Sequence, residues 1–154
     1  MRGRPAIVLE EQIAHWQSSY GYVENIAYAI ALAVTDSRAQ HRIYNVAEST
    51  ALSQGDFIRA IAQAAGWLGR VVEVPQSALP ESRVAPFNFA QDWVTDSTRI
   101  RQELAYTEPI AREDAFKRTV KWQRSHPPQM FSQDAPELLD HATEDKILAT
   151  LALG

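Results

Sequence analysis

The sequence predicts an α/β fold that contains a piece of a doubly wound parallel sheet. Three segments in order predict it: a short apolar run at 6–9, an apolar helix at 24–34 and a second strand at 42–46. Residues 26–34 include no charged or strongly polar side chain, so the helix needs cover on more than one side. A parallel sheet also needs neighbouring strands, and the predicted strands are few and short. We therefore expect an exposed apolar surface when the chain is alone.

Helix-start and helix-stop signals predict the later elements. Ser53 is a good N-cap with Asp56 three residues on, and Gly66 ends the helix that they open. The other expected elements are a strand at 71–74, a loop at 76–90, and helices from 96 or 97 to 104, at 112–124 and at 135–153.

Composition bounds the class of protein. With 154 residues, 45% hydrophobic and 22% charged, the chain is globular and suits one domain or one lobe. A net charge of −4 with no basic stripe argues against nucleic acid as a partner. The absence of cysteine excludes disulfides, thiolate catalysis and cysteine-based zinc sites. No apolar run approaches the ~18 residues that span a bilayer, so we expect a cytoplasmic protein without membrane contact.

Three motif regions carry the functional signal. They are GYVENIA at 21–27, RIYNVA at 42–47, and the pair DWVTDSTRI at 92–100 and ELAYTEP at 103–109. The first brings polar side chains to the start of an apolar helix, a common way to present groups to a ligand.

These segments, in this order, resemble the C-terminal half of the extended short-chain dehydrogenase/reductase family, the NAD-dependent epimerases and dehydratases of sugar nucleotides. The resemblance covers residues 5–126. It implies a partial Rossmann-like fold, with a substrate-binding lobe at 1–126, a tail with an amphipathic helix at 127–154, and no N-terminal dinucleotide-binding half. In the complete family enzyme, NAD or NADP exchanges hydride with a sugar carbon of a nucleotide-sugar or related substrate.

The catalytic and cofactor motifs of that family are missing from this chain. Its six glycines form no Gly-rich phosphate turn, and no lysine stands four residues after a tyrosine. We therefore expect no catalytic residue, no bound cofactor and no turnover from this chain alone. No G-x-S-x-G elbow is present, and the four histidines form no metal motif.

The resemblance implies substrate contacts for Tyr22, Glu24 and Asn25. The last two could equally cap the helix start and balance its charge. Asn45 matches the asparagine of the family's Tyr-Asn-Val-Gly strand end, although Ala47 replaces the glycine. An asparagine that bonds its own turn is the alternative.

Arg99 matches a basic position near the nucleotide phosphates, where a guanidinium fork suits a diphosphate. A surface arginine on a solvated helix is the alternative. Many family members place another arginine where this chain has Ser18, Ser19 and Tyr20, so a second phosphate contact is not expected. Trp93 beside its loop is expected to touch ligand, as Trp16 could.

Three functions follow as hypotheses. The first is the substrate-binding lobe of an NAD(P)-dependent epimerase or dehydratase, truncated and inactive alone. The second is a non-enzymatic interaction module that pairs with itself or with a separate cofactor-binding partner. The third is an unrelated acid/base enzyme that uses Glu24 and Asp92.

Overall fold

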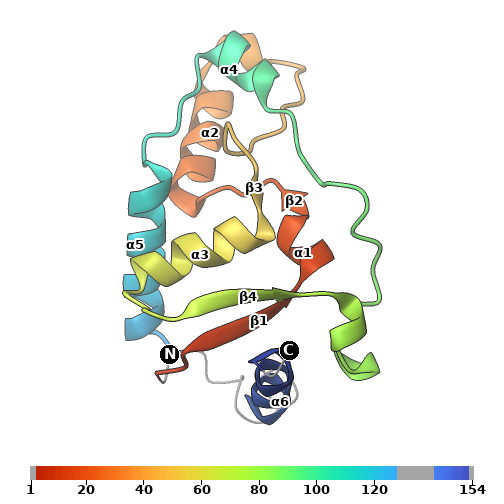
Figure 1. The fold of residues 1–154 in the computed structure, drawn as a ribbon. Coiled ribbons are helices and arrows are strands. Elements are labelled where there is room, and N and C mark those ends of the chain that lie inside the picture. Colours follow the sequence, from red (N-terminus) through yellow and green to blue (C-terminus); the bar gives the residue numbers. More distant parts are fainter. Residues whose placement is uncertain (1–2, 128–140, 153–154) are drawn as a thin grey trace.

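The computed structural model describes residues 3–127 and 141–152, which form an α/β fold (Figure 1). Its strands are β1 (Ala6–Glu10), β2 (Gln17–Ser18), β3 (Leu52–Ser53) and β4 (Arg70–Val74). Its α-helices are α1 (Glu11–His15), α2 (Val23–Thr35), α3 (Gln54–Ala64), α4 (Thr98–Leu104), α5 (Arg112–Ser125) and α6 (His141–Ala152). Short 3₁₀ turns are η1 (Ser37–Ala39), η2 (Gln76–Ala78) and η3 (Glu81–Arg83).

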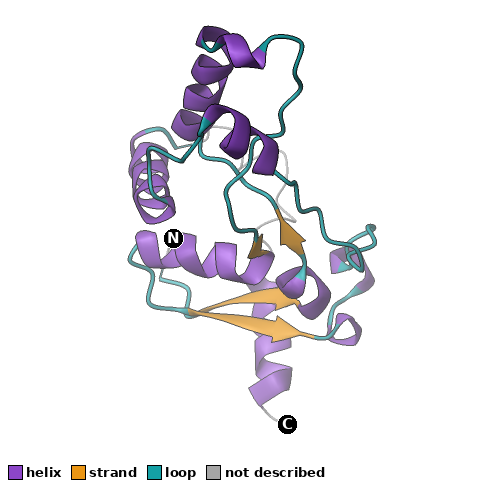
Figure 2. Cartoon of the chain, turned by 90° about the horizontal axis from the view of Figure 1, so that it is seen from above, coloured by secondary structure: helices purple, strands orange, loops and turns teal. Residues whose placement is uncertain are grey.

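The strands form two small sheets, coloured orange in Figure 2. β1 and β4 pair in parallel, with Ala6 opposite Arg70 and Glu10 opposite Val74. β2 and β3 pair antiparallel over two residues each. Helix α3 lies on one face of the β1–β4 pair and α6 lies on the other (Figure 1). This is a piece of a doubly wound sheet, as the sequence predicts.

Two groups of buried side chains hold the fold. One surrounds the parallel pair and includes Val74, which is fully buried, with Ala6, Ala14 and Ala62. The other holds α2 against α4 and consists of Ala29, Ile100, Leu104 and Tyr106. The second group fixes the middle of α2 against α4 and the residue Tyr106 that follows it.

Helix α2 is covered on one side only. Asn25 and Ala29 face the core, whereas Val23, Ile30 and Val34 are 71%, 59% and 79% exposed. With the exposed Ala27 and Ala31 they form one helical stripe, which we call the α2 stripe. The cover on more than one side that the sequence predicts is therefore missing from the described chain, and the expected uncovered apolar surface lies here.

The predicted start and stop of α3 are confirmed. The Ser53 hydroxyl accepts a hydrogen bond of 3.1 Å from the backbone N–H of Asp56, as an N-cap does. Gly66 has a φ of +67°, the left-handed conformation that glycine adopts without steric cost after a helix.

The prediction of a strand at 42–46 is wrong. Residues 42–48 have no regular secondary structure, because no strand in the described chain lies beside them. Instead the half-buried side chains of Tyr44 and Val46 pack on the core between α2 and α4. Ile43 points to solvent and is 83% exposed.

The boundaries of the other helices and strands differ less from those that the sequence predicts. Residues 11–15 form α1 and residues 17–18 form β2. The pattern of apolar residues predicts neither element. Helix α6 begins at His141, and the predicted first turn at Pro136 lies outside the described residues. Arg4 joins α6 to the start of β1 through contacts of 3.1 Å to Glu144 and 2.8 Å to Asp145. No helix within 3–127 and 141–152 is long and apolar enough to cross a membrane.

Candidate functional site

Asn25 is buried at the start of α2 and holds the segment before α5. Its side chain is 2% exposed. The carboxamide donates to the carbonyl of Ile110 at 2.9 Å and accepts from the N–H of Ile110 at 3.0 Å. The Tyr106 hydroxyl reaches the backbone carbonyl of Asn25 at 3.4 Å. Asn25 therefore fixes the segment before α5 against the first turn of α2.

Tyr22 and Glu24 lie on the surface at the same helix start. The Tyr22 hydroxyl donates to Glu24 at 2.6 Å, and Arg118 of α5 donates to the same carboxylate at 2.8 Å. These hydrogen bonds, first from Tyr22 and then from Arg118, lower the pKa of the Glu24 carboxyl. Glu24 is thus held as a carboxylate, which does not suit it to donate a proton near neutral pH.

Asn45 lies on the segment 42–48, and Arg99 of α4 contacts the same segment at Ile43. Asn45 is exposed on the irregular segment 42–48. The Arg99 side chain is about half exposed, donates to the Ile43 carbonyl at 3.3 Å and lies 3.5 Å from Glu103. The Glu103 carboxylate pairs with the charge of Arg99, and the guanidinium remains exposed to solvent.

Trp93 lies against β2, away from these groups. Its N–H donates to the Gln17 carbonyl at 2.9 Å, and its own carbonyl accepts from Ser19 at 3.0 Å. The Asp92 carboxylate accepts from the Gln17 N–H at 2.8 Å, and the Ser19 hydroxyl accepts from the Thr95 N–H at 2.7 Å. Strand-like pairing therefore fixes the Trp93 backbone, while 74% of its surface stays exposed.

A surface depression of about 400 Å³ opens beside this ribbon. Its lining residues are Ser18, Ser19, Asp92, Trp93, Val94 and Thr95. The ring of Trp16 lies 6.1 Å from that of Trp93 and 5.5 Å from that of Phe89, and Phe87 continues the cluster at 6.5 Å from Phe89. Of these rings only Trp93 lines the depression, which we call the aromatic cleft.

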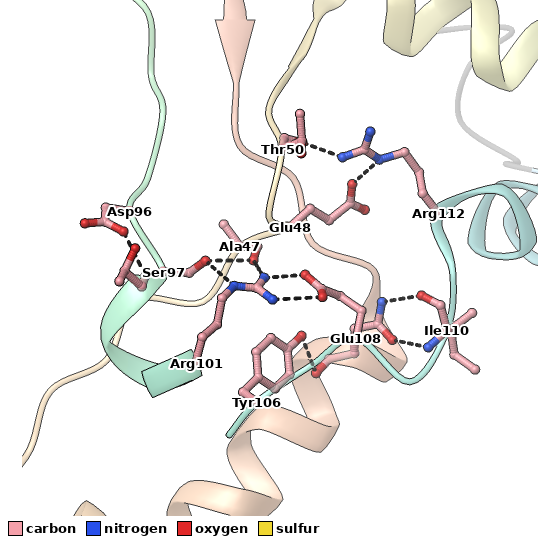
Figure 3. A network of polar contacts seen from close by, with 12 residues as sticks. Ala47, Glu48, Thr50, Asp96, Ser97, Arg101, Tyr106, Glu108, Ile110 and Arg112 are labelled. Atoms are coloured by element: carbon pink, nitrogen blue, oxygen red, sulfur yellow. Dashed lines mark hydrogen bonds and ion pairs between the residues drawn. The ribbon is translucent and has the colours of Figure 1, made fainter. Parts of the chain in front are cut away.

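A polar network lies between α4 and the start of α5 (Figure 3). Arg101 donates to both oxygens of Glu108, with one contact at 2.9 Å, and to the Ala47 carbonyl at 2.8 Å. Ser97 donates to the same carbonyl at 3.2 Å. The hydrogen bonds from Arg101 lower the pKa of the Glu108 carboxyl, against the opposing effect of burial.

The network continues to the first residue of α5. Arg112 donates to the Glu48 carboxylate and to the Thr50 carbonyl (Figure 3). A second cleft of about 240 Å³ opens here between Glu48, Glu108 and Arg112, over Asn25. Both acids have an arginine partner, so this network acts mainly to hold the segments 47–50 and 106–112 together.

The structure does not bring the six predicted site residues together. Asn25 contacts Ile110, and Glu24 contacts Arg118 of α5. Arg99 contacts Ile43, and Trp93 contacts β2. The pair Glu24 and Asp92, proposed above as an acid/base alternative, lies on different elements, with Asp92 bound to Gln17. Within the described ranges, no three histidine, aspartate or glutamate side chains gather as metal ligands.

Sequence reasoning missed Arg101, Glu108 and Arg112. Arg101 and Glu108 are seven residues apart with Tyr106 between them, and a left-handed residue, Ala105, ends the helix there. Residues seven apart share a face of a helix, but here the helix ends at Ala105, between them. The spacing therefore does not predict the ion pair of Arg101 and Glu108.

No model of a protein family matches this chain, and no curated protein matches its sequence. Its fold is similar to two crystal structures of the Bordetella bronchiseptica enzyme WbmF. For the complex with NADH the TM-score is 0.54 at 15% identity, over 92% of this chain and 37% of that one. For the complex with NAD⁺ and UDP it is 0.56 at 15% identity, over 90% and 36%.

A third similar structure is a short-chain dehydrogenase/reductase superfamily protein from Agrobacterium tumefaciens with bound NAD. Its TM-score is 0.53 at 16% identity, over 78% of this chain and 34% of that one. The chain thus spans little more than a third of the length of these enzymes. It has part of the Rossmann-like α/β fold of the short-chain dehydrogenases.

Proposed function

We propose that this chain is the substrate-binding lobe of an NAD(P)-dependent epimerase or dehydratase of the extended short-chain dehydrogenase type. In this proposal a separate cofactor-binding part supplies the NAD(P) site and the catalytic base. The substrate is a nucleotide-sugar or a related small molecule. One observation carries the proposal: 90% or more of the chain aligns with WbmF, an enzyme whose structures hold NADH or NAD⁺ with UDP.

The junction between β1 and α1 supports the absence of a cofactor site in this lobe. A dinucleotide needs a helix N-terminus with exposed N–H groups and no opposing charge. At this junction the chain has Glu10 and Glu11. Glu10 is 5% exposed, and its Oε2 has no hydrogen-bond partner among the described residues. A carboxylate in this position repels a pyrophosphate.

The α2 stripe supports the proposal that this lobe packs against a separate cofactor-binding part. Val23, Ile30 and Val34 expose apolar surface that an independent domain would bury or replace with polar groups. The cofactor-binding part is the occupant that the proposal assigns to this stripe, because the matched part of this chain covers only 37% of the similar enzyme.

A titration of the ¹⁵N-labelled chain tests the proposal. NADH is expected to shift no resonance at submillimolar concentration, whereas sugar nucleotides or uncharged glycosides are expected to shift residues of the aromatic cleft and of segment 22–25. No NADH is expected to form when NAD⁺ and these substrates are added together. Tight NADH binding, or reduction of NAD⁺ by the purified chain, would overturn the proposal.

The α2 stripe also favours a second candidate function, an interaction module that pairs with itself. This candidate predicts a dimer and no small-molecule binding at the aromatic cleft. Sedimentation velocity combined with the same titration separates the two, because the substrate-lobe proposal requires the small-molecule shifts.

A further inference from the structure

A groove of about 700 Å³ lies between α3 and α5, which pack side by side (Figure 1). The half-buried apolar side chains that line it are Leu52, Ala60, Ala64 and Phe116. The ring of Phe116 is held in place because it meets the ring of Phe57 edge-on, with 5.3 Å between the centroids and an angle of 77°. The groove is therefore formed before any partner binds, and it shares no lining residue with the aromatic cleft.

Most charges along this groove are already balanced within the chain. Three charged lining residues have an ion pair: Asp56 with Arg59 at 3.1 Å, Lys117 with Asp114 at 3.4 Å, and Arg112 with Glu48. Within residues 3–127 and 141–152, Glu113 is the one charged lining residue without an ion pair, and it is exposed to water. The groove therefore fits an occupant with an apolar face that brings no set of matching charges.

The α2 stripe has such a face. No residue from 26 to 34 is charged, and the exposed side chains of the stripe recur at helical spacing on one side of α2. At 1.5 Å per residue, the stripe from Ala27 to Val34 is about 10 Å long, and the α3 wall of the groove from Asp56 to Ala64 is about 12 Å long. An apolar helix face laid into a groove between helices is a common mode of association. The stripe and the groove therefore match in length, polarity and charge.

The two surfaces cannot meet within one chain. Ala29 packs α2 against α4, and Asn25 ties the start of α2 to Ile110, so the stripe cannot move to the groove. Pairing of two stripes with each other would leave both grooves uncovered, whereas a stripe in a groove covers apolar surface on both copies.

We propose that the groove between α3 and α5 binds the α2 stripe of a second copy of this chain. The contact is head-to-tail, because it joins two different surfaces of the two copies. The stripe cannot hold a second copy and the cofactor-binding part at once. The pairing therefore belongs to the lobe while it is separate from that part.

Cross-linking between introduced cysteines tests this contact. The chain has no cysteine, so each introduced thiol reports one position. Ile30→Cys marks the exposed stripe, and Gln63→Cys marks the exposed edge of the groove. A bismaleimide is expected to join the two variants when they are mixed and to give little cross-linked product from either variant alone. The intact mass of the product identifies the mixed dimer.

Thr119→Cys provides the matched control for this cross-link. Thr119 is exposed on α5 but does not line the groove, so its thiol is expected to give little product with Ile30→Cys. The reaction is run at a concentration at which the unmodified chain sediments above the monomer mass.

A charge placed in the groove gives a second measurement. Ala60→Lys is expected to abolish the excess over the monomer mass in sedimentation velocity, because the stripe has no carboxylate to meet the ammonium group. Thr119→Lys is expected to leave that mass unchanged. Circular dichroism checks that Ala60→Lys folds, and the cross-linking experiment does not depend on this variant.

Three results would overturn the inference. They are cross-linking of Ile30→Cys to itself as efficient as to Gln63→Cys, equal cross-linking of Ile30→Cys to Gln63→Cys and to Thr119→Cys, and a monomeric chain at every concentration tested. The first result would assign the contact to two stripes. The proposed function fails by a different result, tight NADH binding or reduction of NAD⁺ by the chain, so the two failures are distinguishable.

Discussion

The carboxamide of Asn25 and the backbone of Ile110 exchange two hydrogen bonds, of 2.9 and 3.0 Å, across 85 residues of sequence. This exchange joins the first turn of α2 to the segment that begins α5. Replacement of Asn25 by alanine is expected to lower the free energy of unfolding by about 1–3 kcal/mol, because the half-buried N–H and carbonyl of Ile110 lose their hydrogen-bond partner. Urea unfolding measures the change.

Asn45 provides the control for this prediction. It is an exposed asparagine on the irregular segment 42–48, so Asn45→Ala is expected to change stability by less than about 0.5 kcal/mol. Equal effects of the two substitutions would contradict the structural role of Asn25.

The ion pair of Arg101 and Glu108 makes stability depend on pH. Arg101 lowers the pKa of Glu108 in the folded chain, below the value of about 4.3 for a free glutamate. A lowered pKa stabilises the fold above the unfolded pKa, and the contribution is lost as pH falls through the folded pKa. The difference in unfolding free energy between the unmodified chain and Glu108→Gln is therefore expected to shrink between about pH 5 and pH 3.

Glu113 provides the control for the pH dependence, since it is exposed in the first turn of α5. The unmodified chain and Glu113→Gln are expected to lose stability in parallel over the same range. A pH-independent difference for Glu108→Gln would show that the ion pair contributes nothing.

The α2 stripe is expected to drive self-association of the isolated chain. Replacement of Ile30 and Val34 together by glutamate removes exposed apolar surface and buries no charge, because the two side chains are 59% and 79% exposed. Sedimentation velocity at high concentration is expected to show a smaller weight-average mass for this variant, with unfolding unchanged within about 0.5 kcal/mol.

The matched control lies on α5. Thr119 is exposed on a helix without an apolar stripe at that position, so Thr119→Glu is expected to leave the sedimentation profile as it is. Identical profiles for all three proteins would show that the stripe mediates no contact.

Ala105 and Gly66 each follow a helix in the left-handed conformation. Exchanging alanine and glycine at these two positions is expected to change the free energy of unfolding in opposite directions. Ala105 after α4 has a φ of +55°, and Gly66 after α3 has a φ of +67°. Ala105→Gly is expected to raise the free energy of unfolding by about 0.5–1 kcal/mol, because a Cβ is strained there. Gly66→Ala is expected to lower it by about 1 kcal/mol for the same reason.

Thermal unfolding of both variants checks this pair. A Cβ at Gly66 would meet no atom within 4 Å, so a loss of stability there reflects backbone strain and not a clash. Effects of equal sign would contradict the assigned conformations.

Local signals in the sequence predict much of the fold. Ser53, Gly66 and the apolar run at 71–74 place α3 and β4, because capping and strand patterns act over a few residues. The strand at 42–46 is predicted wrongly for a physical reason: a strand exists only with a partner, and sequence pattern cannot show whether one is present. Tyr44 packs on the core instead, and its hydroxyl donates to Glu103 at 2.8 Å.

Less of the candidate site than of the fold could be predicted from the sequence. The motifs identify Asn25 and Trp93 as special positions, but not that one is buried as a clamp and the other exposed in a cleft. Those differences depend on Ile110 for Asn25 and on Trp16 for Trp93, and each partner lies far away in sequence. The participation of the six predicted residues in substrate binding stays a prediction for each of them: Tyr22, Glu24, Asn25, Asn45, Trp93 and Arg99.

The central claim is that this chain holds the substrate side of a short-chain dehydrogenase and no cofactor site. Calorimetric titration of the purified chain with NADH, beside a parallel titration with a sugar nucleotide, tests it most directly. The account predicts weak binding of the sugar nucleotide that depends on Trp93, and no NADH binding tighter than about millimolar. Stoichiometric NADH binding in the micromolar range would contradict it, because the chain would then hold a dinucleotide site of its own.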